Sequence, residues 1–90
     1  MALIKVEFMV TVNLYSYGIA RDIVNERKMP LTLEADIVTV GDIRLHLYDK
    51  YPRLKSLASL AIGVNDEYVN DDTIVTDQDE IILIPPVSGG

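Results

Sequence analysis

One helix is clearly marked in the sequence, and it limits the folds that are open to the chain. Thr39 stands where an N-cap residue is favoured, and Asp42, three residues later, can complement the free N–H groups of the first turn. The apolar residues that recur at helical spacing are Val40, Ile43, Leu47 and Tyr51. The helix must end before Pro52. A single helix of about three turns can cover only one face of a sheet.

Strand-like patterns precede this helix. Residues 4–12 alternate between apolar and polar side chains, and residues 31–35 alternate again. Residues 13–30 have no clear period, since Gly18 interrupts them, and they allow only a short helix over 19–27.

More strands are predicted after the helix. Residues 60–65 and 68–69 can pair about a turn at Asp66 and Glu67, and residues 81–84 form the last strand after a polar turn. The order strand, strand, helix, short strands, strand predicts an α+β fold of the β-grasp type. Its mixed sheet carries one main helix on one face and leaves the other face open.

We expect one domain over residues 1–90, a length that suits a single modest core. Residues 85–90 are expected to form a flexible C-terminal tail.

The open face of the predicted sheet holds an anomaly. Met9 interrupts the polar side of the first strand, and the last strand is apolar on both sides. If these strands are neighbours, Met9, Tyr68 and Ile84 can form one exposed apolar patch suited to a partner protein. The alternative is that residues 13–30 fold over this face and cover it.

Charge and composition exclude several classes of partner. The formal net charge of −6 repels phosphate backbones and anionic lipids, and the 8 Lys and Arg are scattered along the sequence. We therefore expect neither nucleic acid nor a membrane as a partner, and a basic protein surface as a better match. The longest mostly apolar stretch, residues 57–64, is much shorter than a membrane span. The absence of cysteine excludes disulfides and fits a cytoplasmic protein.

Few residues could carry catalysis. His46 is the single histidine, so neither a Ser-His-Asp set nor a Cys-His pair is convincing, and we interpret it as an ordinary surface residue. The acidic residues of 66–80 lack the spacing of a calcium loop and are better explained as solvated turns. We expect no metal site, no permanently bound cofactor and no catalysis by the chain alone.

The most distinctive segment is the C-terminal sequence Pro85-Pro86-Val87-Ser88-Gly89-Gly90. The two prolines favour an extended chain that leaves the sheet, and the residues after them become progressively smaller. Such a thin tail can thread a narrow channel in a partner, where a Cβ on either of the last two residues would collide. The competing explanation is a frayed terminus that ends in two glycines by chance.

A carboxylate at the end of this tail must be activated before it can react, because its charge repels nucleophiles and oxide is a poor leaving group. ATP can supply that activation through an acyl adenylate. A sulfur nucleophile then yields a thiocarboxylate on Gly90, whereas a lysine amine yields an isopeptide bond. The residues leave both fates open.

Several segments resemble the MoaD family of molybdopterin synthase small subunits. They are IKVEF near the start, TVGDI and YP at the two ends of the helix, GVNDEYV, and DEIILIPPVSGG at the end. The resemblance covers most of the chain and implies a ubiquitin-like fold. It also implies that a MoeB-like enzyme adenylates Gly90 with ATP and that a sulfur donor converts it to a thiocarboxylate. The tail would then enter a MoaE-like large subunit and donate sulfur to the pterin precursor of the molybdenum cofactor.

The resemblance assigns roles to individual residues. Gly90, with Gly89, is the reacting end. The positions expected to contact the large subunit are Met9, Tyr68, Ile84, Pro85, Pro86, Val87 and Ser88. Gln78 departs from the family, which usually has glycine at that turn, so we expect a differently shaped or strained turn. Carriers for thiamine synthesis or tRNA thiolation, and ubiquitin-like modifiers joined to lysines through Gly90, remain alternatives.

Overall fold

Seven strands, two α-helices and one 3-10 helix make up residues 8–86, the part of the chain that the computed structural model describes. In chain order they are β1 (Val10–Ser16), α1 (Gly18–Val24), β2 (Lys28–Leu33), β3 (Val38–Thr39), α2 (Val40–Lys50), η1 (Pro52–Ser56), β4 (Ala61–Val64), β5 (Glu67–Tyr68), β6 (Ile74–Val75) and β7 (Glu80–Ile84). The predicted order of the main elements is confirmed, and the short elements β3, β6 and η1 are additions. Within 8–86, no helix has the length and apolar character needed to cross a membrane.

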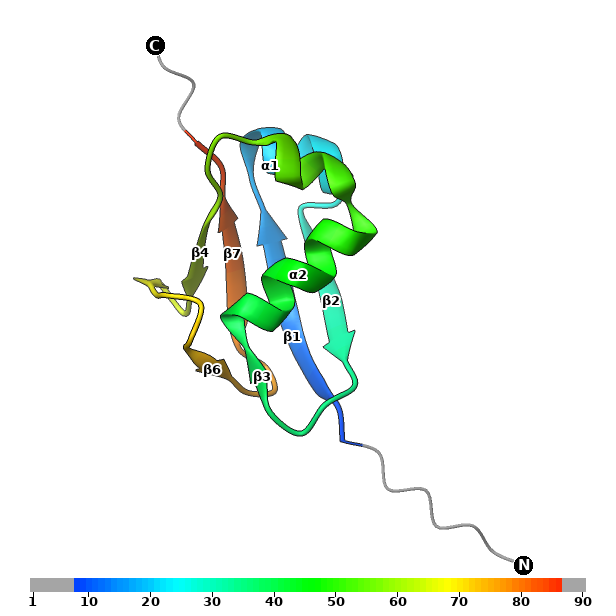
Figure 1. Ribbon diagram of the computed structural model, residues 1–90, viewed down its shortest axis with the longest axis vertical. Helices are drawn as coiled ribbons and strands as arrows, with labels where there is room; N and C mark the ends of the chain where they lie inside the picture. Colours follow the sequence, from blue (N-terminus) through cyan, green and yellow to red (C-terminus); the bar gives the residue numbers. More distant parts are fainter. Residues whose placement is uncertain (1–7, 87–90) are drawn as a thin grey trace, which may run out of the picture.

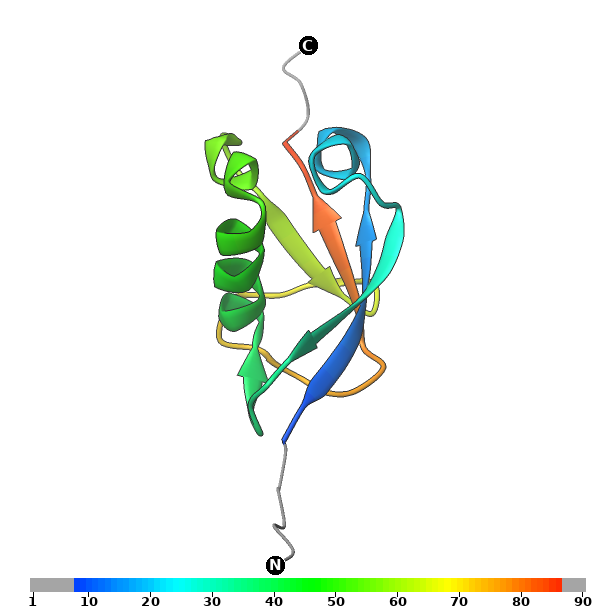
Figure 2. The ribbon, with the colours of Figure 1, turned by 90° about the vertical axis from the view of Figure 1, so that its right-hand side faces the viewer.

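Five strands form a mixed sheet in the order β2-β1-β7-β4-β5. β1 and β7 are parallel neighbours, while the other pairs are antiparallel. Helix α2 lies across one face of this sheet, and the small β3–β6 sheet lies beside the start of α2 (Figure 1, Figure 2). This is the predicted β-grasp arrangement.

The core lies between α2 and the sheet. Its fully buried side chains from the two parallel strands and the helix are Val12, Leu14, Ile81, Leu83, Val40, Ile43 and Leu47. Each large aliphatic side chain of this kind contributes roughly 1.5–3 kcal/mol relative to an exposed position. The buried side chains of the helix and the alternate side chains of the two strands therefore pack into one common core.

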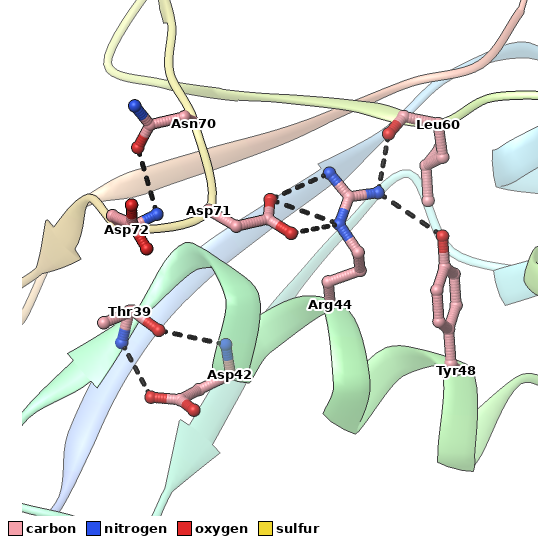
Figure 3. A network of polar contacts seen from close by, with 8 residues as sticks. All are labelled: Thr39, Asp42, Arg44, Tyr48, Leu60, Asn70, Asp71 and Asp72. Atoms are coloured by element: carbon pink, nitrogen blue, oxygen red, sulfur yellow. Dashed lines mark hydrogen bonds and ion pairs between the residues drawn. The ribbon is translucent and has the colours of Figure 1, made fainter.

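The start of α2 is fixed by the predicted capping box. The Thr39 hydroxyl accepts a hydrogen bond from the Asp42 N–H at 3.2 Å, and the Asp42 carboxylate accepts one from the Thr39 N–H at 2.9 Å (Figure 3). Further along the helix, the Arg44 guanidinium donates to both carboxylate oxygens of Asp71. It also donates to the Leu60 carbonyl at 2.7 Å. These bonds attach the β5–β6 loop and the chain before β4 to the helix.

The first strand begins later than predicted. Residues 4–7 lie outside the described part, Phe8 is 58% exposed, and pairing starts at Val10 and continues to Ser16. The same two-residue period runs through Leu14, so the alternation identified the buried side of the strand but could not locate its ends. The later start moves Met9 from the middle of the strand to a position just before it.

Residues 13–30 do not cover the open face of the sheet. They complete β1, form α1, whose Ala20 and Val24 join the core, and begin β2 at Lys28. α1 is shorter than predicted because Asn25 adopts a left-handed backbone, with φ 66°, and ends it. None of these residues lines the hollow on the open face, so the covering alternative is wrong.

The turn before β7 is strained at Gln78, as its departure from glycine led us to expect. Gln78 has a left-handed backbone with φ 75°, and its N–H donates to the Thr11 carbonyl over 2.9 Å. A left-handed conformation costs a residue with a Cβ roughly 1–2 kcal/mol.

Gln78→Gly should raise the free energy of unfolding by about 0.5–1 kcal/mol, because relief of this strain exceeds the extra chain entropy of glycine. In a domain of this size, thermal denaturation should show a rise in Tm of roughly 4–8 °C per kcal/mol. Gln78→Ala keeps a Cβ and is the control, with an expected change below about 0.3 kcal/mol. A glycine variant that melts at or below the wild-type temperature would contradict the assigned strain.

Candidate functional site

The open face of the sheet carries apolar side chains at its centre. Ile82 of β7 lies between Tyr15 of β1 and Gly63 of β4 in the sheet register. Ile84, two residues further on, lies beside Ala61. Both isoleucines alternate with the buried residues of β7, so they point away from α2. β7 therefore contributes side chains to the core on one face of the sheet and to an apolar surface on the other face.

Gly63 leaves room on this surface. It pairs with Ile82 on one side and with Tyr68 on the other, and a hollow of about 200 Å³ lies there. A Cβ on Gly63 would lie 3.6 Å from the Ile84 Cδ1, so a larger residue would begin to fill the hollow. The Tyr68 side chain at its rim is 78% exposed. We refer to Tyr15, Tyr68, Ile82 and Ile84 as the open-face patch.

Met9 does not join Tyr68 and Ile84, contrary to the prediction of one patch. Tyr15 is level with Ile82 in the parallel pairing, whereas Met9 lies six residues before Tyr15. Six residues of strand span about 20 Å. Met9 instead lines a second hollow with residues 32–35, 37 and 38 and with Asp42 and His46 of α2. The prediction failed because the strand beside β7 starts later than the alternation suggested.

Tyr15 is the residue of this surface that the sequence reasoning missed. It is half-buried, its hydroxyl donates to the Glu80 carboxylate over 3.5 Å, and the Lys28 ammonium lies 5.5 Å from its ring centroid. The sequence holds a signal for its position, because Tyr15 is an even number of residues after Met9 and therefore points to the same face of a continuous strand. Residues 13–30 taken together have no clear period, and this hides the alternation that continues through Tyr15.

The predicted tail begins with Pro85 and Pro86, which directly follow β7 and are half-buried. Neither proline has an N–H to offer, so neither can donate a bond that would extend the sheet. Gly18 lies beside them with φ 54°, and a Cβ there would approach the Pro85 Cγ to 3.4 Å. Val87, Ser88, Gly89 and Gly90 lie outside the described residues. The chain thus leaves β7 at the end of the sheet where α1 lies (Figure 1).

Hydrogen bonds at the start of β7 hold the β4–β5 hairpin that carries the exposed tyrosine. Asn65 and Asp66 form its turn with left-handed backbones, φ 49° and 74°, one residue earlier than predicted. The Asn65 amide donates to the Asp79 carboxylate and accepts from the Glu80 N–H, both at 2.9 Å. Partial burial would raise the pKa of Asp79, but hydrogen bonds from Thr76 and Asn65 outweigh it and lower that pKa below its ordinary value.

The described part of the chain, 8–86, gathers no three His, Asp or Glu side chains into a possible metal site. His46 is exposed on α2 and lines the same hollow as Met9, beside Glu34 and Asp42. The open-face patch and the base of the tail are therefore the features that suit contact with a partner protein.

Comparison with known proteins identifies the family of this chain. The sequence matches the ThiS family over residues 17–90. The molybdopterin synthase sulfur carrier subunit of Mycobacterium tuberculosis is 30% identical over 83 residues, which cover 91% of this chain and 100% of that protein. The protein of the same name from Arabidopsis thaliana is 43% identical over 42 residues, 46% of this chain and only 44% of that protein's length.

Solved structures share the fold. The small archaeal modifier protein 1 of Methanosarcina acetivorans is 29% identical with a TM-score of 0.72, covering 91% of this chain and 98% of that one. A complex of subunits 1 and 2 of the Helicobacter pylori molybdopterin-converting factor contains a chain that is 27% identical with a TM-score of 0.62, covering 89% of this chain and 99% of that one. The chain belongs to the ThiS family and is a ubiquitin-like sulfur-carrier protein of the MoaD and ThiS type.

Proposed function

We propose that this chain is the small, sulfur-carrying subunit of a molybdopterin synthase and that Gly90 carries the sulfur. The observation that best supports this proposal is that the tail and the open-face patch share one strand, since β7 carries Ile82 and Ile84 and leads directly into Pro85. A partner that docks on the patch would receive the tail at a set distance from its docking contacts. The names of the relatives agree with this assignment.

The reacting group proposed for the tail is its terminal carboxylate, which partner enzymes must activate and sulfurate. A MoeB-like enzyme would join the Gly90 carboxylate to the α-phosphate of ATP and release pyrophosphate. A donor of sulfide-level sulfur would then attack the acyl carbon, release AMP and leave a thiocarboxylate. In a MoaE-like large subunit, the thiocarboxylate sulfur would bond to a carbon of the pterin precursor and displace an oxygen leaving group, which gives a thioester. Water would then cleave the acyl C–S bond of this thioester, which leaves the sulfur on the pterin and returns Gly90 to a carboxylate.

β7 is suited to hold a reacting tail because it is paired on both sides. It lies between β1 and β4, and its Ile81 and Leu83 are fully buried. A change of chemical group on the tail therefore leaves the core intact, while the core keeps Pro85 beside Gly18. The same domain can then be presented in turn to an activating enzyme, a sulfur donor and a synthase.

The open-face patch is the proposed docking surface for the large subunit. Subunit 1 of the Helicobacter pylori molybdopterin-converting factor is solved in complex with subunit 2, and this chain is similar to one chain of that complex. Exposed aromatic residues beside apolar hollows are typical of interface hot spots. Tyr68, 78% exposed at the rim of the hollow, is the residue that such a partner would cover.

Conjugation to other proteins is the second candidate function. It is favoured by the similarity to the Methanosarcina acetivorans small archaeal modifier protein 1. The activated Gly90 would then react with a lysine amine and form an isopeptide bond. Thiamine synthesis and tRNA thiolation would use the same thiocarboxylate with other acceptors.

Deletion of Gly90, or addition of one residue after it, should abolish adenylation without unfolding the domain. The reason is that the reacting carboxylate moves while the core within residues 8–86 is untouched. The measurement is pyrophosphate release from ATP by the cognate activating enzyme, with thermal denaturation of each variant alongside. Asp36→Asn, on an exposed loop, is the control and should release pyrophosphate normally. Normal activation of the shortened chain, or its unfolding, would overturn the role given to Gly90.

Tyr68→Lys should weaken binding to the cognate large subunit by about tenfold or more, because a charge would be buried in an apolar contact, and tenfold corresponds to about 1.4 kcal/mol. Met9→Lys is the matched control, since it also replaces an exposed apolar side chain with lysine, and its affinity should stay within about twofold. Calorimetric titration measures both, and Tm should be nearly unchanged. An equal loss of affinity in the two variants would show that Met9 also belongs to the interface. Unchanged affinity in both would show that the open-face patch is not the docking surface.

A further inference from the structure

The charged side chains of residues 8–86 are divided between two halves of the molecule. The tail half is the one in which β7 leads into Pro85, and the far half lies at the other end of the sheet. α1, the start of β2, the end of α2 and η1 all lie in the tail half in both ribbon views (Figure 1, Figure 2). Strand register agrees, because Ser16 is level with Leu83 and donates its N–H to the Arg27 carbonyl.

The tail half is basic and the far half is acidic. The elements that carry or flank the charged residues assign them to the two halves. Six of the seven Lys and Arg within 8–86 belong to the elements of the tail half or to the turn that joins α1 to β2: Arg21, Arg27, Lys28, Lys50, Arg53 and Lys55. The three carboxylates of these segments are Asp22, Glu26 and Asp49. The far half has Arg44, in the first half of α2, and ten carboxylates: Glu34, Asp36, Asp42, Asp66, Glu67, Asp71, Asp72, Asp77, Asp79 and Glu80. Six less three gives a formal charge of +3 in the tail half, and one less ten gives −9 in the far half.

The cations of the tail half face solvent. All six are exposed, and none takes part in an ion pair with a described residue, whereas Arg44 of the far half pairs with Asp71. Lys28 and Lys50 lie 5.5 and 5.6 Å from the ring centroids of Tyr15 and Tyr51, which leaves their charge in place. Asp22 and Glu26 line the same hollow as Arg21 and Arg27 and offset part of this charge, so that a formal charge of +3 remains around the exit of the tail.

Helix dipoles account for only part of this arrangement. Arg21 lies in the last turn of α1 and Lys50 in the last turn of α2, where a cation is favoured. Arg27 and Lys28 belong to no helix. A polyanion such as RNA is a poor match, because the net charge of the tail half is small and the far half is strongly negative.

We propose that the partner proteins that receive the tail carry carboxylates around the opening of the receiving channel, and that this chain approaches them tail first under electrostatic steering. The proposal rests on the function proposed above, in which the tail enters a partner. A dipolar protein turns its basic end toward an acidic opening before contact, which raises the association rate more than the lifetime of the complex. The net charge of −6 alone suggests a basic partner, because it does not show that the charges are divided between a basic half and an acidic half.

The test is the association rate constant with the cognate activating enzyme and with the cognate large subunit, measured by stopped flow at low and high salt. Arg21→Gln with Arg27→Gln removes two exposed cations near the exit of the tail. Asn70→Asp with Gln78→Glu is the matched control. It also lowers the formal net charge of −6 by two, but in the loops before and after β6 in the far half. Thermal denaturation verifies that both double variants are folded.

The tail-half variant should associate about three- to tenfold more slowly at low salt, with an unchanged dissociation rate, while the control stays within about twofold. The difference should vanish near 1 M salt, where the screening length is about 3 Å. Equal rates for the two variants, or faster association of the tail-half variant, would overturn the proposal while binding itself still supports the carrier function. A wild-type chain that binds neither partner would remove the proposed function and this inference with it.

Discussion

The parallel pairing of β1 with β7 is the interaction on which the rest of the structure depends. It places Leu14 beside Ile81 under α2, and it places Tyr15 beside Ile82 on the opposite face. One pairing therefore builds the core and the apolar surface together, because successive side chains of a strand point to opposite faces. It also makes β7 an inner strand with neighbours on both sides, so that Pro85 leaves the domain from a strand that is held along both edges.

The two ends of the sheet have different tasks. Turns and loops concentrate in the far half, where Asn65 bridges the hairpin to Asp79 and Arg44 holds Asp71. Many carboxylates there accept backbone or side-chain hydrogen bonds, which favours acidic residues in that half. The tail half instead consists of helix ends and the exit of β7, and its cations face solvent. The acidic residues thus lie in the half that holds the structural turns, and the basic residues lie in the half from which the tail leaves.

Local signals in the sequence predict the fold well. The candidate site is harder to predict, because it depends on which distant segments the fold brings together. The capping box at Thr39 and the stripe of α2 act within a few residues, so they could be read directly. The alternation of β1 identifies the buried side, yet a period of two does not say where pairing begins. The sequence therefore predicts Met9 beside β7, where the structure has Tyr15. The basic half could not be recognised along the chain, because Arg21 and Lys55 come from distant segments that only the fold brings together.

The central claim is that Gly90 exists in the cell as a carrier of sulfur. The most direct measurement is the intact mass of the native, untagged protein isolated from its own cells, combined with a search for Gly90 joined to lysines of other proteins. We expect a fraction whose mass increases by the replacement of one oxygen with sulfur at the C-terminus. Abundant isopeptide conjugates without any thiocarboxylate would contradict it and would establish the protein as a modifier instead.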